Sequence, residues 1–291
     1  MDAQQFLAEF GHIANAPGGV ARLRELVLSL AFKGELCPVS KESSETLLEK
    51  IEKQRLEFKA ETRKQRLARQ RAAVEEPTVP YEIPANWSWV SLSTVGHTWG
   101  QKKPDSPFVY IDVSSIDNKA GVLSKNPEIK TPSNAPSRAR KIVKNGTLVY
   151  STIRPYLLNI AVIDRDFDLE PIASTAFAIV HPWEGISVRY LYHYLRSPVF
   201  VKYVESVQSG MAYPAISDDK FYSGMIPIPP SEEQSRIVTK VEELMALCNQ
   251  LEAQQQKRHT LQNHLRQATL QAVADSQSPH ELHDSWQRLE A

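Results

Sequence analysis

The longest regular pattern of apolar and polar positions runs from Ser231 to about Ala274 and predicts one continuous α-helix. The prolines between positions 227 and 230 exclude a regular helix before it, and Ser231 followed by Gln234 has the spacing of a capping box. At about 1.5 Å per residue such a helix is roughly 65 Å long. Because no compact domain needs so long a helix for its own core, we expect it to span between structural units.

Apolar residues within this segment recur at alternating steps of four and three and form a narrow seam. The seam consists of Ile237, Val241, Leu244, Cys248 and Leu251. After a polar run it resumes with a shifted phase at Leu261, Leu265, Ala268 and Ala272. A seam of this length would be unfavourable in water, so it predicts a coiled coil with a partner.

Shorter helical patterns come first in the chain. Residues 2–13 and 23–33 each carry apolar side chains at helical spacing, and Gly34 closes the second helix in the C′ position. Residues 43–71 are helical in propensity but thinly apolar, and they end in the most basic run of the chain, Arg63–Arg71. That run is either a solvated helix or tether, or a segment that contacts phosphate or docks on another subunit.

A proline-rich connection, Glu75–Pro84, separates these helices from a region with short β-like runs. The runs that predict strands are Trp87–Val95, Phe108–Val113, Thr147–Ile153, Ile160–Ile163 and Phe177–Val180. One helix, Ser187–Val207, interrupts them. We therefore expect an α+β domain with a mixed, mostly antiparallel sheet, accompanied by the N-terminal helices and the long C-terminal coiled-coil helix.

These patterns divide the chain into five segments. They are an N-terminal helical segment at 1–76, a linker at 77–86, the β-rich domain at 87–230, the long helix at 231–274 and a polar tail at 275–291. The phrase at Leu23–Ala31 returns in altered form at Leu265–Val273, so a similar helical sequence precedes the β-rich domain and ends the long helix.

Composition excludes several classes of protein. The 291 residues carry a formal net charge of zero, which leaves room for a local basic groove but not for a uniformly basic surface. The two cysteines, Cys37 and Cys248, lack the spacing of a zinc site or a disulfide framework, in keeping with a reducing compartment. No apolar run is long enough to span a membrane and no secretory signal is recognisable, so we expect a cytoplasmic protein.

Five phrases in the observed order resemble the specificity subunit of type I restriction–modification systems. They are LRELVLSLAFKGEL (23–36), VPYEIPANWSWVSL (79–92), GTLVYSTIRPYLLNIAV (146–162), SGMAYPAIS (209–217) and MIPIPPSEEQSRIVTKVEELM (225–245). The resemblance covers nearly the whole chain. It implies a target-recognition domain followed by a long helix, in a subunit that does no chemistry and binds no cofactor or metal.

The resemblance also implies partners. A specificity subunit binds double-stranded DNA and holds two DNA adenine methyltransferase subunits, and in the full complex the restriction subunits as well. Family members usually carry two recognition domains and two long helices, whereas this chain has one of each, so we expect a half-subunit. We expect two copies, or two different halves, to pair through the seam, most strongly at 237–251. The expected interface residues are Ile237, Val241, Leu244, Cys248, Leu251, Leu261 and Leu265.

Three groups of loop residues have the chemistry that DNA recognition needs, which is cations and hydroxyls for phosphates and a few side chains for base edges. One precedes a proline turn at 101–103, one is the basic segment 133–144, and the third combines 151–156 with 208–213. The residues that we expect to contact DNA are Lys102, Lys103, Arg138, Arg140, Lys141, Lys144, Ser151, Thr152, Arg154, Tyr156, Ser209, Met211 and Tyr213.

Each group has a structural alternative. The turn at 154–156 can pack under the sheet as part of the framework, and Tyr213 can be a buried aromatic anchor. The basic residues between Arg138 and Lys144 can be ordinary surface charge.

The competing enzyme hypothesis is a magnesium-dependent nuclease. Asp105 followed by Glu128 and Lys130 matches a loose metal-nuclease pattern, but both carboxylates lie in segments rich in proline and asparagine that predict turns rather than adjacent strands. The sequence has no glycine loop for S-adenosylmethionine, no NPPY-like motif, no P-loop, and no GxSxG or HExxH motif. A non-catalytic alternative is a coiled-coil regulator that competes for methyltransferase subunits without reading DNA.

Overall fold

The computed structural model describes residues 3–14, 16–62 and 79–275, together with residues 278, 280 and 283. The basic run at 63–71 and most of the tail lie outside these residues. The chain forms two compact units: unit 1 combines Met1–Arg24 with Glu242–Ala291, and unit 2 is Glu25–Val241. The boundaries of the units therefore cross both the N-terminal segment and the long helix, unlike the segment boundaries expected from sequence.

Unit 2 contains two four-stranded sheets and two short strand pairs. The first sheet has the order β6 (Glu128–Lys130), β3 (Phe108–Ile111), β10 (Pro171–Ser174) and β7 (Ala139–Ile142). The second has the order β2 (Gly96–His97), β11 (Phe177–Pro182), β8 (Leu148–Ser151) and β9 (Ile160–Val162). The pairs are β1 (Ser88–Ser91) with β12 (Met225–Ile228) and β4 (Ile116–Asp117) with β5 (Val122–Leu123).

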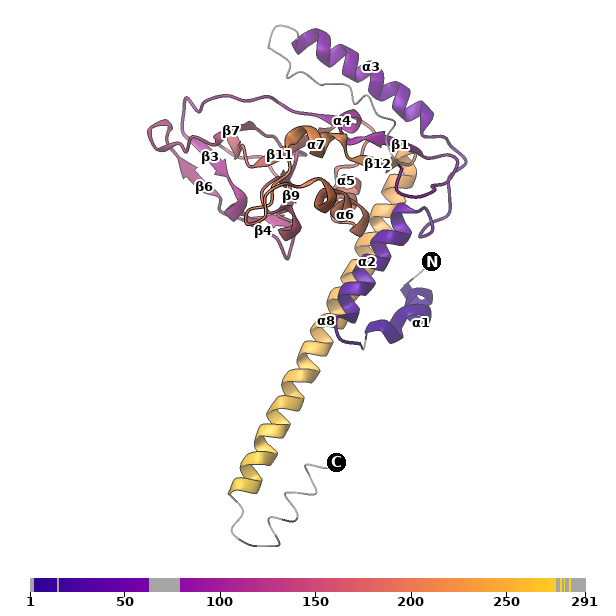
Figure 1. Cartoon of the computed structure of the whole chain (residues 1–291), viewed down its shortest axis with the longest axis vertical. Coiled ribbons are helices and arrows are strands. Elements are labelled where there is room, and N and C mark those ends of the chain that lie inside the picture. Colours follow the sequence, from indigo (N-terminus) through magenta and orange to yellow (C-terminus); the bar gives the residue numbers. More distant parts are fainter. Residues whose placement is uncertain are drawn as a thin grey trace. The chain divides into compact units, whose positions relative to one another are not determined.

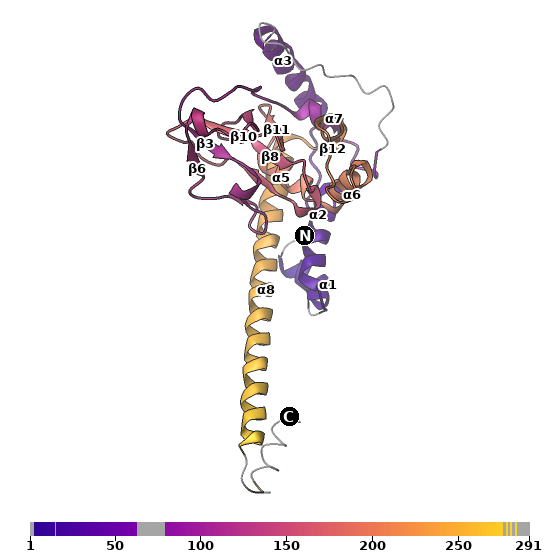
Figure 2. The ribbon, with the colours of Figure 1, turned by 60° about the vertical axis from the view of Figure 1, so that its left-hand side comes forward.

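The two larger sheets share one hydrophobic core. Buried side chains from β3 and β10 pack with those from β8, β9 and β11, including Ile111, Val149, Phe177 and Ile179. Among the described strands, β10 and β3 are parallel and the other pairs are antiparallel, which confirms the predicted α+β class and its mostly antiparallel sheet. Strands β3 and β6 lie at one side of the unit and helices α6 and α7 at the other (Figures 1 and 2).

The predicted helix at 187–207 is two helices. Helix α5 is Val188–Leu195 and helix α6 is Pro198–Val207. Ser197 separates them because its side chain accepts a hydrogen bond from the Phe200 amide as an N-cap, and Pro198 occupies the first turn of α6. Helix α7, Asp218–Ser223, was not predicted. The strand predicted at 87–95 ends early and continues as the short helix α4, Leu92–Val95.

The N-terminal helices agree more closely with the sequence. Helix α1 is Ala3–Ala14, α2 is Gly19–Phe32 and α3 is Glu45–Thr62. Gly34 has a φ of +77° after α2, and the Glu35 amide donates to the Leu30 carbonyl at 2.9 Å while the Gly34 amide donates to Ala31 at 3.3 Å. These two bonds are a Schellman motif, which confirms the predicted C′ glycine.

The long helix is confirmed with its predicted bounds, because α8 spans Ser231–Ala274 without interruption (Figure 1). Its predicted capping box is wrong. The Gln234 amide donates to the Pro230 carbonyl at 3.0 Å, so Pro230 is the N-cap residue, and the Ser231 hydroxyl donates to the Gly185 carbonyl instead. The fully buried Gln234 side chain accepts from the Ser187 amide at 2.8 Å and donates to the Pro229 carbonyl at 3.0 Å.

The N-terminal part of the seam, Ile237 to Cys248, is buried within the single chain. This burial contradicts the prediction that these residues contact a second copy. Ile237 and Val241 in unit 2, and Leu244 and Cys248 in unit 1, are at most 2 % exposed within the single chain. They belong to intramolecular cores, because the chain supplies N-terminal helices to both units. The predicted maximum of self-contact at 237–251 is therefore wrong.

In unit 1 the covering elements are α1 and the start of α2. The Arg24 guanidinium donates to Glu252 at 2.6 Å and to Asn249 at 2.8 Å, and the Gln255 side chain donates to the Ala14 carbonyl at 2.5 Å. Further along α8 the predicted contact residues Leu261 and Leu265 are 59 % and 67 % exposed. None of the helices within the described ranges is long and apolar enough to cross a bilayer.

Candidate nucleic-acid interface

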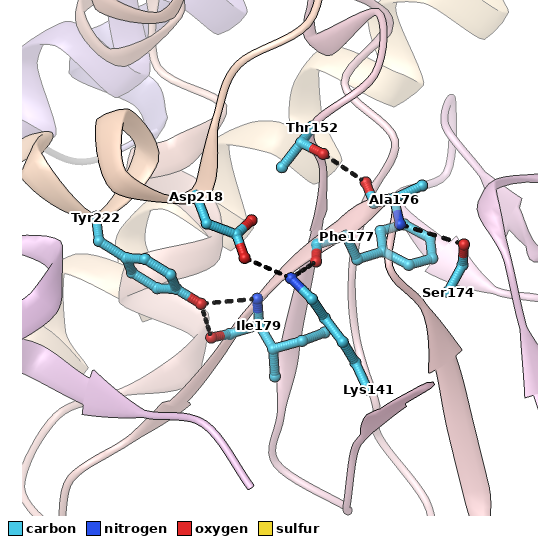
Figure 3. Close-up of polar contacts among 8 residues, drawn as sticks. All are labelled: Lys141, Thr152, Ser174, Ala176, Phe177, Ile179, Asp218 and Tyr222. Carbon is cyan, nitrogen blue, oxygen red and sulfur yellow. Dashed lines mark hydrogen bonds and ion pairs between the residues drawn. The ribbon is translucent and has the colours of Figure 1, made fainter. Parts of the chain in front are cut away.

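Lys141 is part of the framework beneath the candidate loops, not of their surface. Its ammonium group donates to the Phe177 carbonyl at 2.6 Å and to the Asp218 carboxylate at 2.7 Å, and the residue is only 7 % exposed (Figure 3). Asp218 is the first residue of α7, and Tyr222 of the same helix bonds to the backbone of Ile179 in β11 (Figure 3). The structure thus contradicts the prediction that Lys141 contacts DNA.

The two hydroxyls at the end of β8 are also internal. The Thr152 hydroxyl donates to the Ala176 carbonyl at 2.9 Å (Figure 3). The Ser151 hydroxyl donates to the Ile153 carbonyl at 2.8 Å. Both residues are buried, so their prediction as DNA contacts is wrong. The Ile216 amide donates to the Thr152 carbonyl at 2.9 Å, which ties the end of the 208–215 loop to this framework.

Above this framework the structure joins two of the predicted segments into one loop pair, residues 153–158 and 208–215. Ile153 and Ala215 form a β-bridge, and the Arg154 amide donates to the Pro214 carbonyl at 2.8 Å. Arg154 has a left-handed backbone with a φ of 47°, and its guanidinium lies 4.9 Å from the centre of the Tyr213 ring. Such a stacked pair is a cation–π contact. Two segments more than fifty residues apart therefore present one combined surface.

The outer side chains of the loop pair are exposed. Tyr213 is 70 % exposed, Tyr156 is 47 % exposed and Met211 is fully exposed, while Ser209 is exposed and bridges to Ala215 through its backbone. The alternative of Tyr213 as a buried anchor is therefore wrong. The alternative of a framework turn holds only for Pro155, which is buried between exposed Arg154 and exposed Tyr156.

The basic residues of the other two segments also converge. Segment 100–102 runs along β7, because the Lys102 amide donates to the Arg140 carbonyl at 2.9 Å and the Ile142 amide donates to Gly100 at 3.1 Å. This pairing places Lys103 in the same region as Arg138 and Arg140, with Lys103 and Arg138 exposed. Lys102 is partly neutralised by Glu170 at 2.5 Å and Asp105 at 3.3 Å, so it is a weaker candidate for a phosphate contact.

Lys144 stands on an aromatic cluster that the sequence did not predict. Its ammonium group lies 3.8 Å from the centre of the Trp99 ring, and Trp99 packs against His97 and His181. Burial, with the nearby charges of His97 and Lys144, lowers the pKa of His181 to about 4. Burial also lowers the pKa of His97. The His181 imidazole is therefore neutral at pH 7, and Lys144 carries positive charge at this surface.

The sequence of the basic segment does contain a signal that separates buried from exposed lysines. Within and beside β7, the alternate residues Ala139, Lys141 and Val143 are all buried, whereas Arg138 and Lys144 belong to the other alternate set and are exposed. The alternation of buried and exposed residues in a strand could therefore have separated Lys141 from Arg138 and Lys144. No comparable local signal indicates that Trp99 lies under Lys144 or that Asp218 pairs with Lys141, because the two members of each pair are distant in sequence.

The arrangement offers no support for metal-dependent cleavage. Asp105 pairs with Lys102, and Glu128 pairs with Lys130 at 2.5 Å. Glu128–Lys130 is strand β6 at a sheet edge rather than the expected turn. Among the residues the structure describes, no group of three or more histidine, cysteine, aspartate or glutamate side chains could hold a metal ion, and Cys37 and Cys248 are free thiols.

Comparison with known proteins agrees with this architecture. Residues 100–260 match the family described as the type I restriction modification DNA specificity domain. The chain belongs to this family. It is 29 % identical to the EcoAI specificity subunit of Escherichia coli over 93 % of this chain and 47 % of that protein. It is 28 % identical to the EcoEI specificity subunit of Escherichia coli, again over 93 % and 47 %.

Solved structures give the same family relationship. The HsdS subunit from Thermoanaerobacter tengcongensis is 34 % identical with a TM-score of 0.58, over 69 % of this chain and 53 % of that chain. A second structure, from work on complex assembly and conformational transition of the type I R-M system, is 34 % identical with a TM-score of 0.62 over the same shares. The chain thus spans about half the length of the specificity subunits it matches.

Proposed function

We propose that this chain is a non-catalytic DNA-recognition component that reads one half of a bipartite target. The observation that carries the proposal is the exposed loop pair 153–158 and 208–215, with Arg154 stacked on Tyr213, above a buried framework in a member of the specificity family. The loops supply planar and apolar groups for bases, and the basic residues beside them supply charge for phosphates.

We propose a smaller set of DNA contacts than the sequence alone indicated. Lys141, Ser151 and Thr152 hold the loops in place, while Lys102 is already paired. The side chains that remain candidates for DNA contact are Lys103, Arg138, Arg140, Lys144, Arg154, Tyr156, Ser209, Met211 and Tyr213. Five of these nine are cations, which sets the expected dependence of binding on salt.

The long helix is the proposed site of protein assembly. EcoAI and EcoEI are restriction enzymes whose specificity subunits resemble this chain, so we propose that α8 binds DNA adenine methyltransferase subunits and, in the full complex, restriction subunits. Exposed Leu261 and Leu265 support an additional apolar contact beyond the intramolecular seam, with a second copy or another specificity half. A role on DNA also implies a cytoplasmic location, and it requires no cofactor from this chain.

Salt titration of DNA binding tests the recognition role. With four to five phosphates neutralised, the affinity for duplex DNA is expected to fall about 150- to 500-fold between 50 and 200 mM salt. Arg138→Ala and Lys144→Ala are each expected to reduce the logarithmic salt slope by about 0.9. Lys50→Ala, which removes an exposed lysine on α3, is the matched control and should leave the slope unchanged.

A slope near zero for the full chain would contradict direct DNA binding. If methyltransferase subunits still bind the chain under those conditions, the chain is a regulator that competes for them rather than a DNA reader.

A further inference from the structure

The tip of the 208–215 loop carries the most exposed large apolar side chain among the described residues. Met211 is 105 % exposed relative to an extended reference, and Tyr213, Tyr156 and Leu157 of the same loop pair are 70 %, 47 % and 39 % exposed. The two bridged loops thus carry four exposed large apolar or aromatic side chains, which we call the apolar tip. Exposed apolar clusters of this kind mark contact sites in soluble proteins.

Backbone hydrogen bonds constrain the base of the 208–215 loop. The Ser209 amide donates to the Ala215 carbonyl at 2.9 Å and the Ala215 amide donates back to Ser209 at 2.8 Å, which closes the loop at its base. Gly210 has a φ of +94°, and a Cβ atom there would lie 2.8 Å from the Tyr213 carbonyl oxygen, so the turn requires glycine. These contacts therefore fix the backbone at the base of the loop that carries Met211.

The second loop is equally constrained. Arg154 and Leu158 have φ values of 47° and 52°, and they flank the short helix η3, Pro155–Leu157. The Asn118 side chain donates to the Leu157 carbonyl at 3.1 Å, and Arg196 donates to the Leu158 carbonyl at 3.3 Å. Left-handed backbone at two non-glycine residues so close together is unfavourable, and such conformations concentrate at functional sites.

We propose that Met211 is a wedge that inserts into a base step of the bound duplex, with the Arg154–Tyr213 pair as the adjoining stacking surface. The proposal rests on the proposed function and specifies how the loop pair meets DNA. Methionine is among the apolar side chains that proteins insert between base pairs, and aromatic and guanidinium planes stack on exposed base faces. Part of the sequence specificity would then come from the energy needed to unstack one base-pair step, which depends on the sequence of that step.

A protein partner fits the tip less well. Stable protein interfaces bury about 800 Å² on each partner, usually over a continuous surface. The exposed apolar side chains of the tip lie on two short loops rather than on a continuous surface, and the Arg154 guanidinium lies over the Tyr213 ring. A small apolar surface beside a guanidinium suits a groove lined by bases and phosphates.

Unwinding of plasmid DNA tests the wedge. Relaxed plasmid is incubated with the full chain and closed by topoisomerase I, while binding to the same plasmid is measured separately so that variants are compared at equal occupancy. Insertion between bases lowers the local twist, so the wild-type chain is expected to shift the topoisomer distribution. Met211→Ala is expected to lose at least half of the shift with binding reduced less than about threefold, and Met211→Leu is expected to keep it.

Ile129→Ala is the matched control, since Ile129 is also an exposed apolar residue, 64 % exposed, but lies on the edge strand β6 outside the proposed DNA contacts. Binding without any shift, or an unchanged shift in Met211→Ala, would overturn the wedge and leave DNA recognition intact. Absence of plasmid binding would overturn both proposals. A Met211→Ala variant that unwinds normally but no longer co-purifies with a methyltransferase subunit would assign the tip to protein docking instead.

Discussion

Replacing Lys141 distinguishes a framework lysine from a DNA contact. The Lys141 side chain is 8 % exposed and its ion-pair partner Asp218 is 47 % exposed. Lys141→Ala therefore removes two short hydrogen bonds from a charged donor and leaves the Phe177 carbonyl buried without that donor. Charge-assisted hydrogen bonds each contribute about 1.5–3 kcal/mol, but the exposure of Asp218 reduces its share.

We therefore expect Lys141→Ala to reduce the free energy of unfolding of unit 2 by about 2–3 kcal/mol, measured by urea titration of the full chain with tryptophan fluorescence. Asp218→Asn should cost about 1 kcal/mol, and the double variant should cost less than the sum of the two. The affinity for DNA should fall in Lys141→Ala and in Asp218→Asn, and it should fall more in the variant that loses more unfolding free energy.

A different pattern of results would identify Lys141 as a phosphate contact. If Lys141→Ala leaves unfolding unchanged, keeps the effect of Asp218→Asn fully additive and still reduces the salt slope of DNA binding by about one phosphate contact, Lys141 binds phosphate directly. The original expectation from the sequence would then be correct and the buried contact wrong.

Three further outcomes follow from the described contacts. His181 has a native pKa of about 4 against about 6.5 when unfolded, so the unfolded chain binds more protons between these values; stability should fall as pH decreases from about 6.5 to 4, and His181→Gln should show a shallower slope in unfolding measured at pH 7 and pH 5. Gln234→Ala strands the Ser187 amide and the Pro229 carbonyl and should cost about 2–4 kcal/mol in urea unfolding, whereas a change below 0.5 kcal/mol would refute its role at the start of α8. Leu261→Ser with Leu265→Ser should reduce self-association in sedimentation velocity without changing the unfolding of unit 2, and identical sedimentation of variant and wild type would exclude this contact.

The sequence is most informative where order is local. The bounds of α8, the C′ glycine after α2 and strands β3, β8, β9 and β11 follow from apolar periodicity and turn residues in neighbouring positions. Strands such as β4, β5 and β6 are only two or three residues long, and their pairing depends on partners that periodicity cannot identify.

In the candidate site, too, local sequence predicts some residues correctly, whereas others depend on partners distant in sequence. Exposed Arg154, Met211 and Tyr213 were identified from residue type alone, because loops with glycine and aromatic residues present side chains outward. The burial of Lys141 depends on Asp218, which is 77 residues away. Likewise, the buried seam residues between Ile237 and Cys248 lie in units that also contain N-terminal residues about two hundred positions earlier, a relation that local periodicity cannot reveal, so the seam was assigned to an external partner.

Mapping adenine methylation is the most direct test of the central claim. The full chain is produced with a cognate methyltransferase subunit in cells that lack other adenine methylation, and modified sites are read across the genome. We expect a single interrupted motif that is lost when Arg154 and Tyr213 are both replaced by alanine, while the complex with the methyltransferase persists. Methylation that is absent, or a motif that is unchanged by these replacements, would contradict recognition by this loop pair.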